Sequence, residues 1–326
     1  MKKISVIGAG SWGTALAVLL GEKGFDVKLW ARREELANDI ESKKENIQYL
    51  PGIKIPDAVI ADSSMKNILE NSEIIIISVP SEFFRDVVGK IKPYFNSQII
   101  VSATKGVEHT TCKRMSQIIE DVLGKSAKIA VLSGPNHAEE VSTKKPTASV
   151  VASKEKRISK IIAECLCNSH FKLYQLSDVA GVEVCGAFKN ISAIATGVCD
   201  GFGFGDNARA SMMTLGLMEM NKFGRHFGAK RGTVYGLAGV GDLIATCTSK
   251  HSRNRFLGEN LAKGKTFEEI KKDMRGMVAE GVLTTKAVYE YGLKHNIKMH
   301  LVEETYKVLF ENKNINKAVS DLLNLI

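Results

Sequence analysis

The stretch MKKISVIGAGSWGTALAVLL, residues 1–20, decides the fold of this chain. An apolar run at residues 4–7 is typical of a β-strand, and residues 14–20 have the apolar spacing of a helix. The G-x-G-x-x-G motif lies between them. Gly8 permits a tight turn, Gly10 lets a pyrophosphate approach the backbone, and Gly13 lets the helix pack closely on the strand. The free N–H groups at the helix start would face the anion, so the stretch predicts a Rossmann dinucleotide-binding domain.

The same stretch also has features of a secretory signal sequence. Lys2 and Lys3 precede an apolar segment, and Ala15-Leu16-Ala17 resembles a cleavage site. Three glycines and Trp12 interrupt that segment, however, and residues 24–30 predict the next strand of the same domain. We therefore reject a signal peptide.

Length and composition narrow the class of protein. A chain of 326 residues forms one or two domains, and 44% hydrophobic with 25% charged residues is typical of a soluble globular protein. No run approaches the ~18 apolar residues of a membrane span. The six cysteines contain no C-x-x-C pair and the seven histidines no H-x-x-x-H spacing. We therefore expect reduced thiols in a cytoplasmic protein, and no metal site.

The net charge of +9 comes from scattered Lys and Arg residues, with no basic block interleaved with aromatic residues. We therefore expect no nucleic-acid partner. A basic surface would attract small anions such as phosphates. A solvated lysine-rich surface without a binding role explains the charge equally well.

The residues after the second predicted strand bear on cofactor choice. An NAD-specific site usually places Asp or Glu there to bind the ribose 2′-hydroxyl. This chain instead has Arg32 and Arg33 after the strand at residues 27–30. Because arginine binds a 2′-phosphate well, the pair favours NADP or at least tolerates it. Alternatively, the pair is the exposed start of a loop.

The rest of the first half alternates strands and helices. Residues 34–56 favour a helix followed by a loop, and a helix is expected to begin at 136–141. Residues 74–77 form a continuous β-branched run, which is typical of a strand buried on both faces. The further strands are predicted at residues 58–61, 73–79, 98–103, 127–132, 147–152 and 171–176, and the further helices at 83–92 and 155–167.

Strand signals become rare after residue 177, where Gly, Ala, Met and helical spacing dominate. We therefore predict an α/β chain with a Rossmann domain at residues 1–180 and an all-α substrate domain at residues 181–326. Ligands of such sheets bind beyond the carboxyl ends of the strands. Lys105 follows the strand at 98–103 and is expected at that crevice.

Lys189 is the one charged residue between Glu183 and Asp200. Its neighbours three and four positions away on a helix are small and supply no counter-charge. Partial desolvation lowers the pKa of a lysine, and a lysine that titrates near neutrality can give and take a proton. Asn190 beside it could orient an oxygen. Alternatively, Lys189 extends along the helix to water.

Two further segments contain candidate polar groups. The sequence GLAGVGDLIATCTS, residues 236–249, places Asp242 before an apolar helix, where it could cap the helix or accept a hydrogen bond from a substrate or a lysine. Ser252, Arg253 and Asn254 suit a phosphate, because a guanidinium donates two parallel hydrogen bonds. Alternatively, they form a solvated loop. Residues 278–281 are a weaker candidate loop.

Taken together, these motifs resemble the bacterial glycerol-3-phosphate dehydrogenases that use NAD(P). The resemblance implies a Rossmann domain and a helical substrate domain, usually in a homodimer. It also implies reversible reduction of dihydroxyacetone phosphate to sn-glycerol 3-phosphate for phospholipid synthesis, with NAD or NADP. The matching motifs are GAGSWGT at 8–14, VPS at 79–81, ATKG at 103–106, SGP at 133–135, FKN at 188–190, GLAGVGDLIATCTS at 236–249, SRN at 252–254 and AEG at 279–281.

The resemblance also implies roles for individual residues. Lys189 would be the proton donor and acceptor, while Lys105 and Arg253 would touch both ligands. The other cofactor contacts would be Gly8, Gly10, Ser11, Trp12, Gly13, Arg32, Arg33, Ala138, Val278 and Glu280. The other substrate contacts would be Gly134, Asn136, Asn190, Asp242, Ser252 and Asn254.

One position departs from the family pattern. The family commonly has serine and phenylalanine after SGP, whereas this chain has Asn136 and His137. Asn136 could still donate a hydrogen bond to a substrate oxygen. His137 is an alternative catalytic acid, but we prefer Lys189, because packing explains the setting of Lys189 less well.

The expected mechanism divides the work between cofactor and protein. The nicotinamide would carry the hydride, Lys189 the proton, and Arg253 with Asn254 the phosphate, while Lys105 and Asp242 fix the lysine and the substrate oxygens. Two other functions remain open. One is a related dehydrogenase of a hydroxy or keto acid, whose carboxylate residues 252–254 would bind. The other is a non-catalytic dinucleotide sensor, which would need an output surface that the sequence does not provide.

Overall fold

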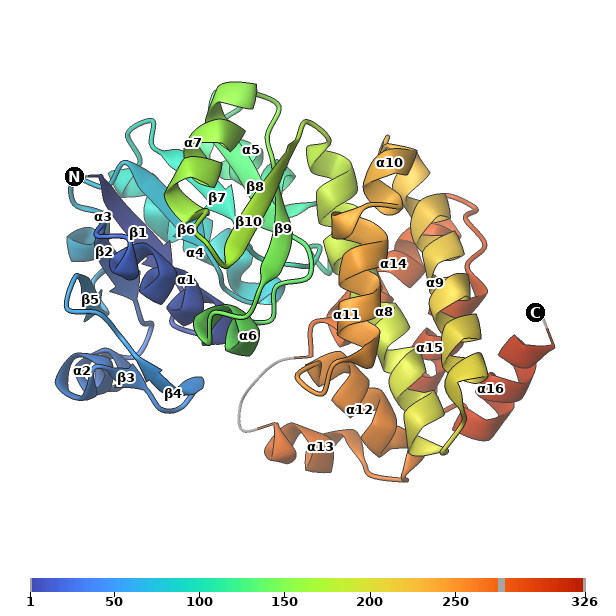
Figure 1. Ribbon diagram of the computed structural model, residues 1–326. Coiled ribbons are helices and arrows are strands. Elements are labelled where there is room, and N and C mark those ends of the chain that lie inside the picture. Colours follow the sequence, from blue (N-terminus) through green and yellow to red (C-terminus); the bar gives the residue numbers. More distant parts are fainter. Residues whose placement is uncertain (1, 275–278, 325–326) are drawn as a thin grey trace. The chain divides into compact units, whose positions relative to one another are not determined.

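The protein forms two compact units, seen in a computed structural model that describes residues 2–274 and 279–324 (Figure 1). The first unit comprises Met1–Thr104 and Met115–Val179, and the second comprises Lys105–Arg114 and Ala180–Ile326. The boundary between the units near residue 180 is as expected, but Lys105–Arg114, placed in the first domain by the sequence, belongs to the second unit by its contacts. This segment follows a strand of the first unit, but its buried Val107 and Cys112 belong to the apolar core of the second unit.

The described part of the first unit is built on an eight-stranded sheet in the order β10-β9-β8-β7-β6-β1-β2-β5. Neighbouring strands are parallel except β8 and β9, which are antiparallel. Each predicted strand is present within two residues at either end. The strands are β1 (Lys3–Ile7), β2 (Asp26–Trp30), β5 (Val59–Asp62), β6 (Ile74–Ile77), β7 (Ile99–Ser102), β8 (Lys128–Ser133), β9 (Thr147–Ala152) and β10 (Phe171–Leu176).

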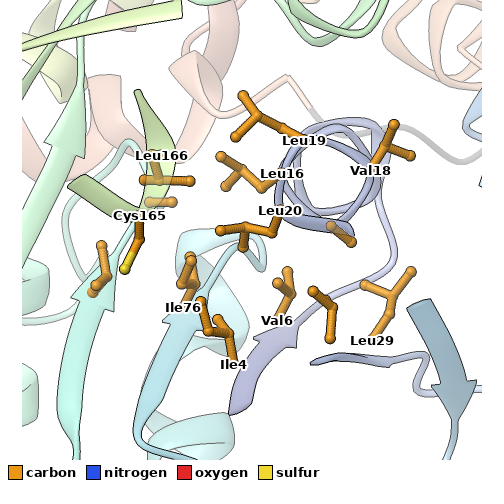
Figure 2. Close-up of a cluster of buried hydrophobic side chains, with 14 of the residues drawn as sticks. Ile4, Val6, Leu16, Val18, Leu19, Leu20, Leu29, Ile76, Cys165 and Leu166 are labelled. Atoms are coloured by element: carbon orange, nitrogen blue, oxygen red, sulfur yellow. The ribbon is translucent and has the colours of Figure 1, made fainter. Parts of the chain in front are cut away.

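Strand β6 is buried on both faces, as its β-branched run predicts. Ile74 and Ile76 point into the core formed with α1 (Ser11–Glu22) and α7 (Lys156–Leu166). Figure 2 shows this core, where side chains of β1, β2 and β6 meet those of α1 and α7. Ile75 and Ile77 point into the opposite core with α4 (Phe84–Ile91) and α5 (Met115–Leu123). Helices on both faces hold the strand ends in fixed positions.

Two local expectations in the first unit are wrong. Residues 34–56 contain α2 (Glu34–Lys43) as expected, but then form an antiparallel pair, β3 (Glu45–Asn46) and β4 (Leu50–Lys54), instead of a loop. These strands are too short for a clear alternating pattern. Helix α6 (Ala138–Ser142) begins later than expected, because the backbone of His137, at the N-cap position, is still extended. The remaining short helices are α3 (Met65–Leu69) and 3₁₀ turns at Ser81–Phe83 and Lys92–Tyr94.

The described part of the second unit is helical, as predicted. Its long helix α8 (Val179–Gly201) has the length and composition of a membrane span, although the sequence predicts no run of that kind. The most apolar 18-residue window of α8 is entirely buried, as in the core helix of a globular unit. The other elements are α9 (Asp206–His226), α10 (Arg231–Val234), a π-helical turn (Leu237–Gly241), α11 (Asp242–Thr248), α12 (Arg253–Ala262), α13 (Phe267–Asp273), α14 (Gly281–Lys294), α15 (His300–Phe310) and α16 (Ile315–Leu323).

Candidate functional site

The glycine turn lies where the strand order of the sheet reverses. The chain leaves β1 toward β2 on one side and later returns to β6 on the other side of β1. Ligands of open α/β sheets bind beyond the carboxyl ends of the strands at this switch point. The turn from Gly8 to Gly13 therefore occupies the position expected of a nucleotide site.

Each of the three positions in the turn has a different physical reason to be glycine. Gly8 has a φ of +116°, and a Cβ on it would lie 2.4 Å from the carbonyl oxygen of Ser78. A Cβ on Gly13 would lie 1.8 Å from the carbonyl oxygen of Gly8. A Cβ on Gly10, in contrast, would meet nothing within 4 Å. The fold itself does not require glycine at position 10, whereas a bound pyrophosphate would.

The start of α1 also fits an anionic ligand. Gly10 caps this helix without a side chain, and the first turn contains no acidic residue, so its N–H groups remain available to an anion. Trp12 lies in the same turn, and its buried Nε1 has no hydrogen-bond partner among the described residues. Ala138, at the start of α6, packs against Ala15 of α1. The turn, with Ser11 as the first helical residue, fits the predicted dinucleotide.

Arg32 and Arg33 lie exposed beyond the end of β2. The guanidinium of Arg32 is 5.5 Å from the centroid of the Phe83 ring, and Arg33 Nη2 donates to Gln48 Oε1 at 2.5 Å. A cationic pair at this position suits a 2′-phosphate. Exposure is also what a solvated loop predicts, so the preference for NADP stays a prediction.

Lys189, Asp242 and Lys105 form a buried cluster in the second unit. Lys189 of α8 is 4% exposed, and its Nζ donates to Asp242 Oδ1. Lys105 Nζ donates to Asp242 Oδ2 at 3.0 Å, and Thr246 Oγ1 donates to Oδ1 at 3.3 Å. Two ammonium groups therefore share one carboxylate.

Two alternatives from the sequence are thereby wrong. Lys189 does not extend to water, and its counter-charge comes from Asp242, 53 positions along the chain. Asp242 is not the N-cap of α11, because Gly241 has that position and the π-helical turn leads directly into α11. The carboxylate of Asp242 binds the two lysines instead.

The surroundings of Lys189 and Asp242 shift the pKa values of both groups. The pKa of Lys189 is lowered from 10.5 to about 7, mainly by burial and further by the Lys105 ammonium, against the opposing effect of the Asp242 carboxylate. Burial alone would raise the pKa of Asp242, but Lys105 and Lys189 outweigh this effect and hold it below 3.8. Asp242 therefore stays ionised near pH 7, and Lys189 is the group able to exchange a proton there.

Residues 252–254 are not a solvated loop, because they begin α12. Ser252 caps this helix through a hydrogen bond from the Arg255 backbone N–H to its Oγ, at 3.2 Å. Arg253 is exposed, and no described residue binds its guanidinium. An unpaired guanidinium at a helix N-terminus suits a phosphate. Arg255, in contrast, donates to Asp200 at 2.6 Å and is a structural residue.

Asn254, the next residue of α12, is buried, in contrast to the exposed Arg253. It binds the side chain of Asn190 on α8 and the backbone of Gly281 at the start of α14. Glu280, an expected cofactor contact, occupies the cap position of α14. Val278, another expected contact, lies outside the described residues.

The segment after β8 is held by Ser149 of β9. Gly134 has a φ of +127°, and a Cβ on it would lie 2.7 Å from Ser149 Oγ. Asn136 is buried and donates from Nδ2 to the same oxygen at 2.9 Å, while Ser149 donates to the Ser133 carbonyl at 2.7 Å. The chain thus accommodates Asn136 through a local hydrogen-bond network.

Sequence reasoning missed two contributors to this region. Thr246 supports Asp242, and its i+4 spacing on a helix was the available signal. The ion pair between Arg114 and Glu183 joins residues 69 positions apart and has no local signal. Among the described residues, no group of three or more His, Cys, Asp or Glu side chains could hold a metal ion.

Comparisons with known proteins agree with this geometry. Family models described as the N-terminus and C-terminus of NAD-dependent glycerol-3-phosphate dehydrogenase match residues 3–159 and 178–320. A glycerol-3-phosphate dehydrogenase (NAD(P)+) from Chlorobium phaeobacteroides strain BS1 is 45% identical over 324 residues, which covers 98% of this chain and 97% of that protein. The enzyme of that name from Bacillus mycoides is 44% identical over 329 residues, covering 100% of this chain and 96% of that one.

Solved structures of similar fold include a glycerol-3-phosphate dehydrogenase as well. The crystal structure of glycerol-3-phosphate dehydrogenase from Coxiella burnetii matches with a TM-score of 0.95 and 38% identity, covering 99% of this chain and 98% of that one. A ketopantoate reductase from Ralstonia eutropha matches with a TM-score of 0.62 at 14% identity, covering 99% of this chain and 100% of that one, and therefore shares the fold alone.

Proposed function

The chain belongs to the NAD-dependent glycerol-3-phosphate dehydrogenase family, and we propose that it reduces dihydroxyacetone phosphate reversibly to sn-glycerol 3-phosphate. The cofactor is NADPH or NADH, and the product is a building block for glycerophospholipids. The observation that carries the mechanism is the buried Lys189 ammonium, bound to Asp242 beside Lys105.

Lys189 moves the proton of the reaction. The bound nicotinamide supplies the hydride that reduces the carbonyl carbon. As negative charge develops on the carbonyl oxygen, Lys189 donates a proton to it and becomes a neutral amine. In the oxidation of glycerol phosphate, the neutral amine takes the hydroxyl proton instead. Asp242 holds the nitrogen of Lys189 in place throughout, and Lys105 adds a second positive charge next to the developing oxyanion.

Arg253 and the first turn of α12 bind the substrate phosphate. The Arg253 guanidinium has no partner among the described residues, and the N-terminus of α12 adds a favourable dipole. Anchoring the phosphate fixes the orientation of the carbonyl, which contributes to the rate separately from proton transfer.

A spectrophotometric assay tests the proposal. Dihydroxyacetone phosphate should oxidise NADPH or NADH, and Lys189→Met should abolish most of that turnover. Turnover of a 2-keto acid, with none of dihydroxyacetone phosphate, would identify a related hydroxy or keto acid dehydrogenase. Cofactor binding without turnover of any carbonyl compound would identify a dinucleotide sensor.

We further propose that the enzyme works as a homodimer in the cytoplasm. Family resemblance supports the dimer. The six cysteines support the compartment, because all are free thiols and five of them are buried. Light scattering coupled to gel filtration should give twice the 35.6 kDa mass of one chain. Cell fractionation should recover the protein with cytoplasmic markers.

A further inference from the structure

Asn254 is the middle member of a buried chain of hydrogen bonds in the second unit. The backbone N–H of Gly281 donates to Asn254 Oδ1 at 2.8 Å, and Asn254 Nδ2 donates to Asn190 Oδ1 at 3.0 Å. Asn190 and Asn254 are 5% and 7% exposed. These hydrogen bonds thus link the start of α14, through α12, to Asn190, the residue that follows Lys189 on α8.

The Gly281 end of this series of hydrogen bonds determines which atoms donate and which accept. An amide side chain can rotate to exchange its oxygen and nitrogen, but a backbone N–H can only donate. The atom of Asn254 that faces Gly281 must therefore be oxygen, and its nitrogen must face Asn190. Since that nitrogen can only donate, Asn190 must turn its own oxygen toward Asn254. Rotating either amide would bring two donors or two acceptors together.

Gly281 is held firmly enough to impose this direction. Its carbonyl accepts a hydrogen bond from Thr285 Oγ1 at 2.6 Å. A Cβ at position 281 would lie 2.7 Å from Asn254 Oδ1 and 2.8 Å from the Asn190 carbonyl oxygen. Only glycine permits this close approach, so the backbone N–H meets Asn254 directly.

The consequence appears at Asn190. Its oxygen is occupied by Asn254, which leaves its Nδ2 as the group presented away from that contact. No described residue accepts a hydrogen bond from this nitrogen. It is also not one of the fully enclosed polar atoms that lack a partner. Asn190 therefore offers an N–H donor rather than an oxygen to a ligand.

We propose that Asn254 is a positioning residue. Because the first N–H of α14 fixes the orientation of the Asn254 amide, Asn254 in turn fixes the orientation of the Asn190 amide, so that Asn190 donates a hydrogen bond to a substrate oxygen. This inference rests on the proposed function, which places the substrate at Lys189. A ketone oxygen is only an acceptor, so donors from both Lys189 and Asn190 match it. A reversed Asn190 would present an oxygen and repel it.

The variant Asn254→Asp reverses the polarity without changing the size of the side chain. Its carboxylate still accepts from Gly281, but it now faces Asn190 with an oxygen, which forces the Asn190 amide to rotate and donate to it. We expect kcat/KM for dihydroxyacetone phosphate to fall about tenfold or more, the loss of roughly one hydrogen bond. Asn260→Asp is the matched control. Asn260 is also buried in α12, and its Nδ2 donates to the Phe256 carbonyl at 2.9 Å.

Amide NMR separates positioning from structural damage. In the ligand-free wild type, the Asn190 side-chain protons should exchange rapidly with water, and in Asn254→Asp they should be protected. Glycerol 3-phosphate with oxidised cofactor should shift the Asn190 amide signal in the wild type and in Asn260→Asp but not in Asn254→Asp. Asn190→Asp assigns the signal by its loss.

Two results would overturn the inference. One is equal exchange of the Asn190 amide in wild type and Asn254→Asp. The other is an Asn190 signal that glycerol 3-phosphate leaves unshifted in the wild type. The exchange experiment needs no substrate, so it reports the orientation of the Asn190 amide even if the wild type does not oxidise glycerol 3-phosphate. Absence of that oxidation would contradict the proposed function alone.

Discussion

Two buried groups of charged side chains in the second unit differ in what binds their carboxylate. Arg114 and Glu183 form an ion pair, with 2.5 Å between Nη1 and Oε2. In the other group, the ammonium groups of Lys105 and Lys189 both bind the carboxylate of Asp242. The segment Lys105–Arg114 supplies one cation to each cluster. The Arg114–Glu183 pair fastens the segment. In the lysine cluster, burial is the main cause of the lowered pKa of Lys189, and the Lys105 ammonium lowers it further, against the effect of Asp242. Two ammonium groups at one place suit an anionic substrate.

Lys189→Met removes the proton donor and should have the largest effect. We expect kcat to fall by about 10²–10⁴, the usual contribution of an acid–base group, while the cofactor still binds. Steady-state kinetics and fluorescence titration with NADPH measure the two effects. Lys286→Met, at an exposed position of α14, is the control and should leave kcat unchanged. Near-normal turnover by folded Lys189→Met would assign the proton to another group.

Glu183→Ala breaks the Arg114–Glu183 pair and should act on stability. The variant removes the buried carboxylate to which the Arg114 guanidinium donates. We expect the free energy of unfolding to fall by about 3 kcal/mol, at the low end for a buried pair because the Arg114 side chain remains 15% exposed. Glu290→Ala breaks the exposed pair with Lys286 and should cost less than about 1 kcal/mol. Equal losses of the free energy of unfolding in urea denaturation would show that the Arg114–Glu183 pair contributes little.

Arg253→Ala should act on substrate binding. Losing a charged hydrogen bond to phosphate typically costs about 1.5–3 kcal/mol, so the KM for dihydroxyacetone phosphate should rise roughly 10- to 100-fold. The melting temperature should not change, because no described residue binds the Arg253 guanidinium. Arg225→Ala, at the exposed end of α9, is the control. If the KM for the cofactor alone rose, the phosphate assignment would fail.

Replacing both Arg32 and Arg33 by alanine should have the smallest effect. The KM for NADPH should rise about tenfold, because the exposed guanidinium groups would lose their hydrogen bonds to the 2′-phosphate. The KM for NADH should change little, since that cofactor lacks the phosphate. A wild type that strongly prefers NADH would contradict this assignment before any variant is made.

The first unit could be predicted from the sequence largely because its signals are local. Gly8, Gly10 and Gly13 lie within six residues, and the β-branched run of β6 is continuous. Short strands such as β3 and β4 lack a pattern, and the membership of Lys105–Arg114 depends on contacts with a distant core. Local sequence pattern therefore predicts helices and strands well, but it predicts less reliably which unit a segment packs into.

The lysine cluster shows the same limit inside the candidate site. The absence of nearby charges made Lys189 a candidate, and that signal is local. Asp242 and Lys105 lie 53 and 84 positions away from it along the chain, so their sharing of one carboxylate depends on the fold. Asn254 was expected to bind substrate, but its contacts with Asn190 and Gly281 became visible only in the folded chain.

The pH dependence of the reaction follows from the same cluster. Reduction needs the ammonium form of Lys189, so kcat/KM for dihydroxyacetone phosphate should fall as the pH rises through about 7. Oxidation of glycerol 3-phosphate needs the neutral amine, so its kcat/KM should rise over the same range. Profiles in both directions, measured at constant ionic strength, check the opposite signs.

The central claim is most directly tested by titrating Lys189 itself. In protein with ¹³C-labelled lysine, the Cε signal that is absent from Lys189→Met belongs to this residue, and its chemical shift follows protonation. The account predicts a transition near pH 7 in the ligand-free enzyme, far below the ordinary lysine pKa of 10.5. A transition at or above pH 10 would contradict it, because Lys189 would then hold its proton too firmly to serve as the base.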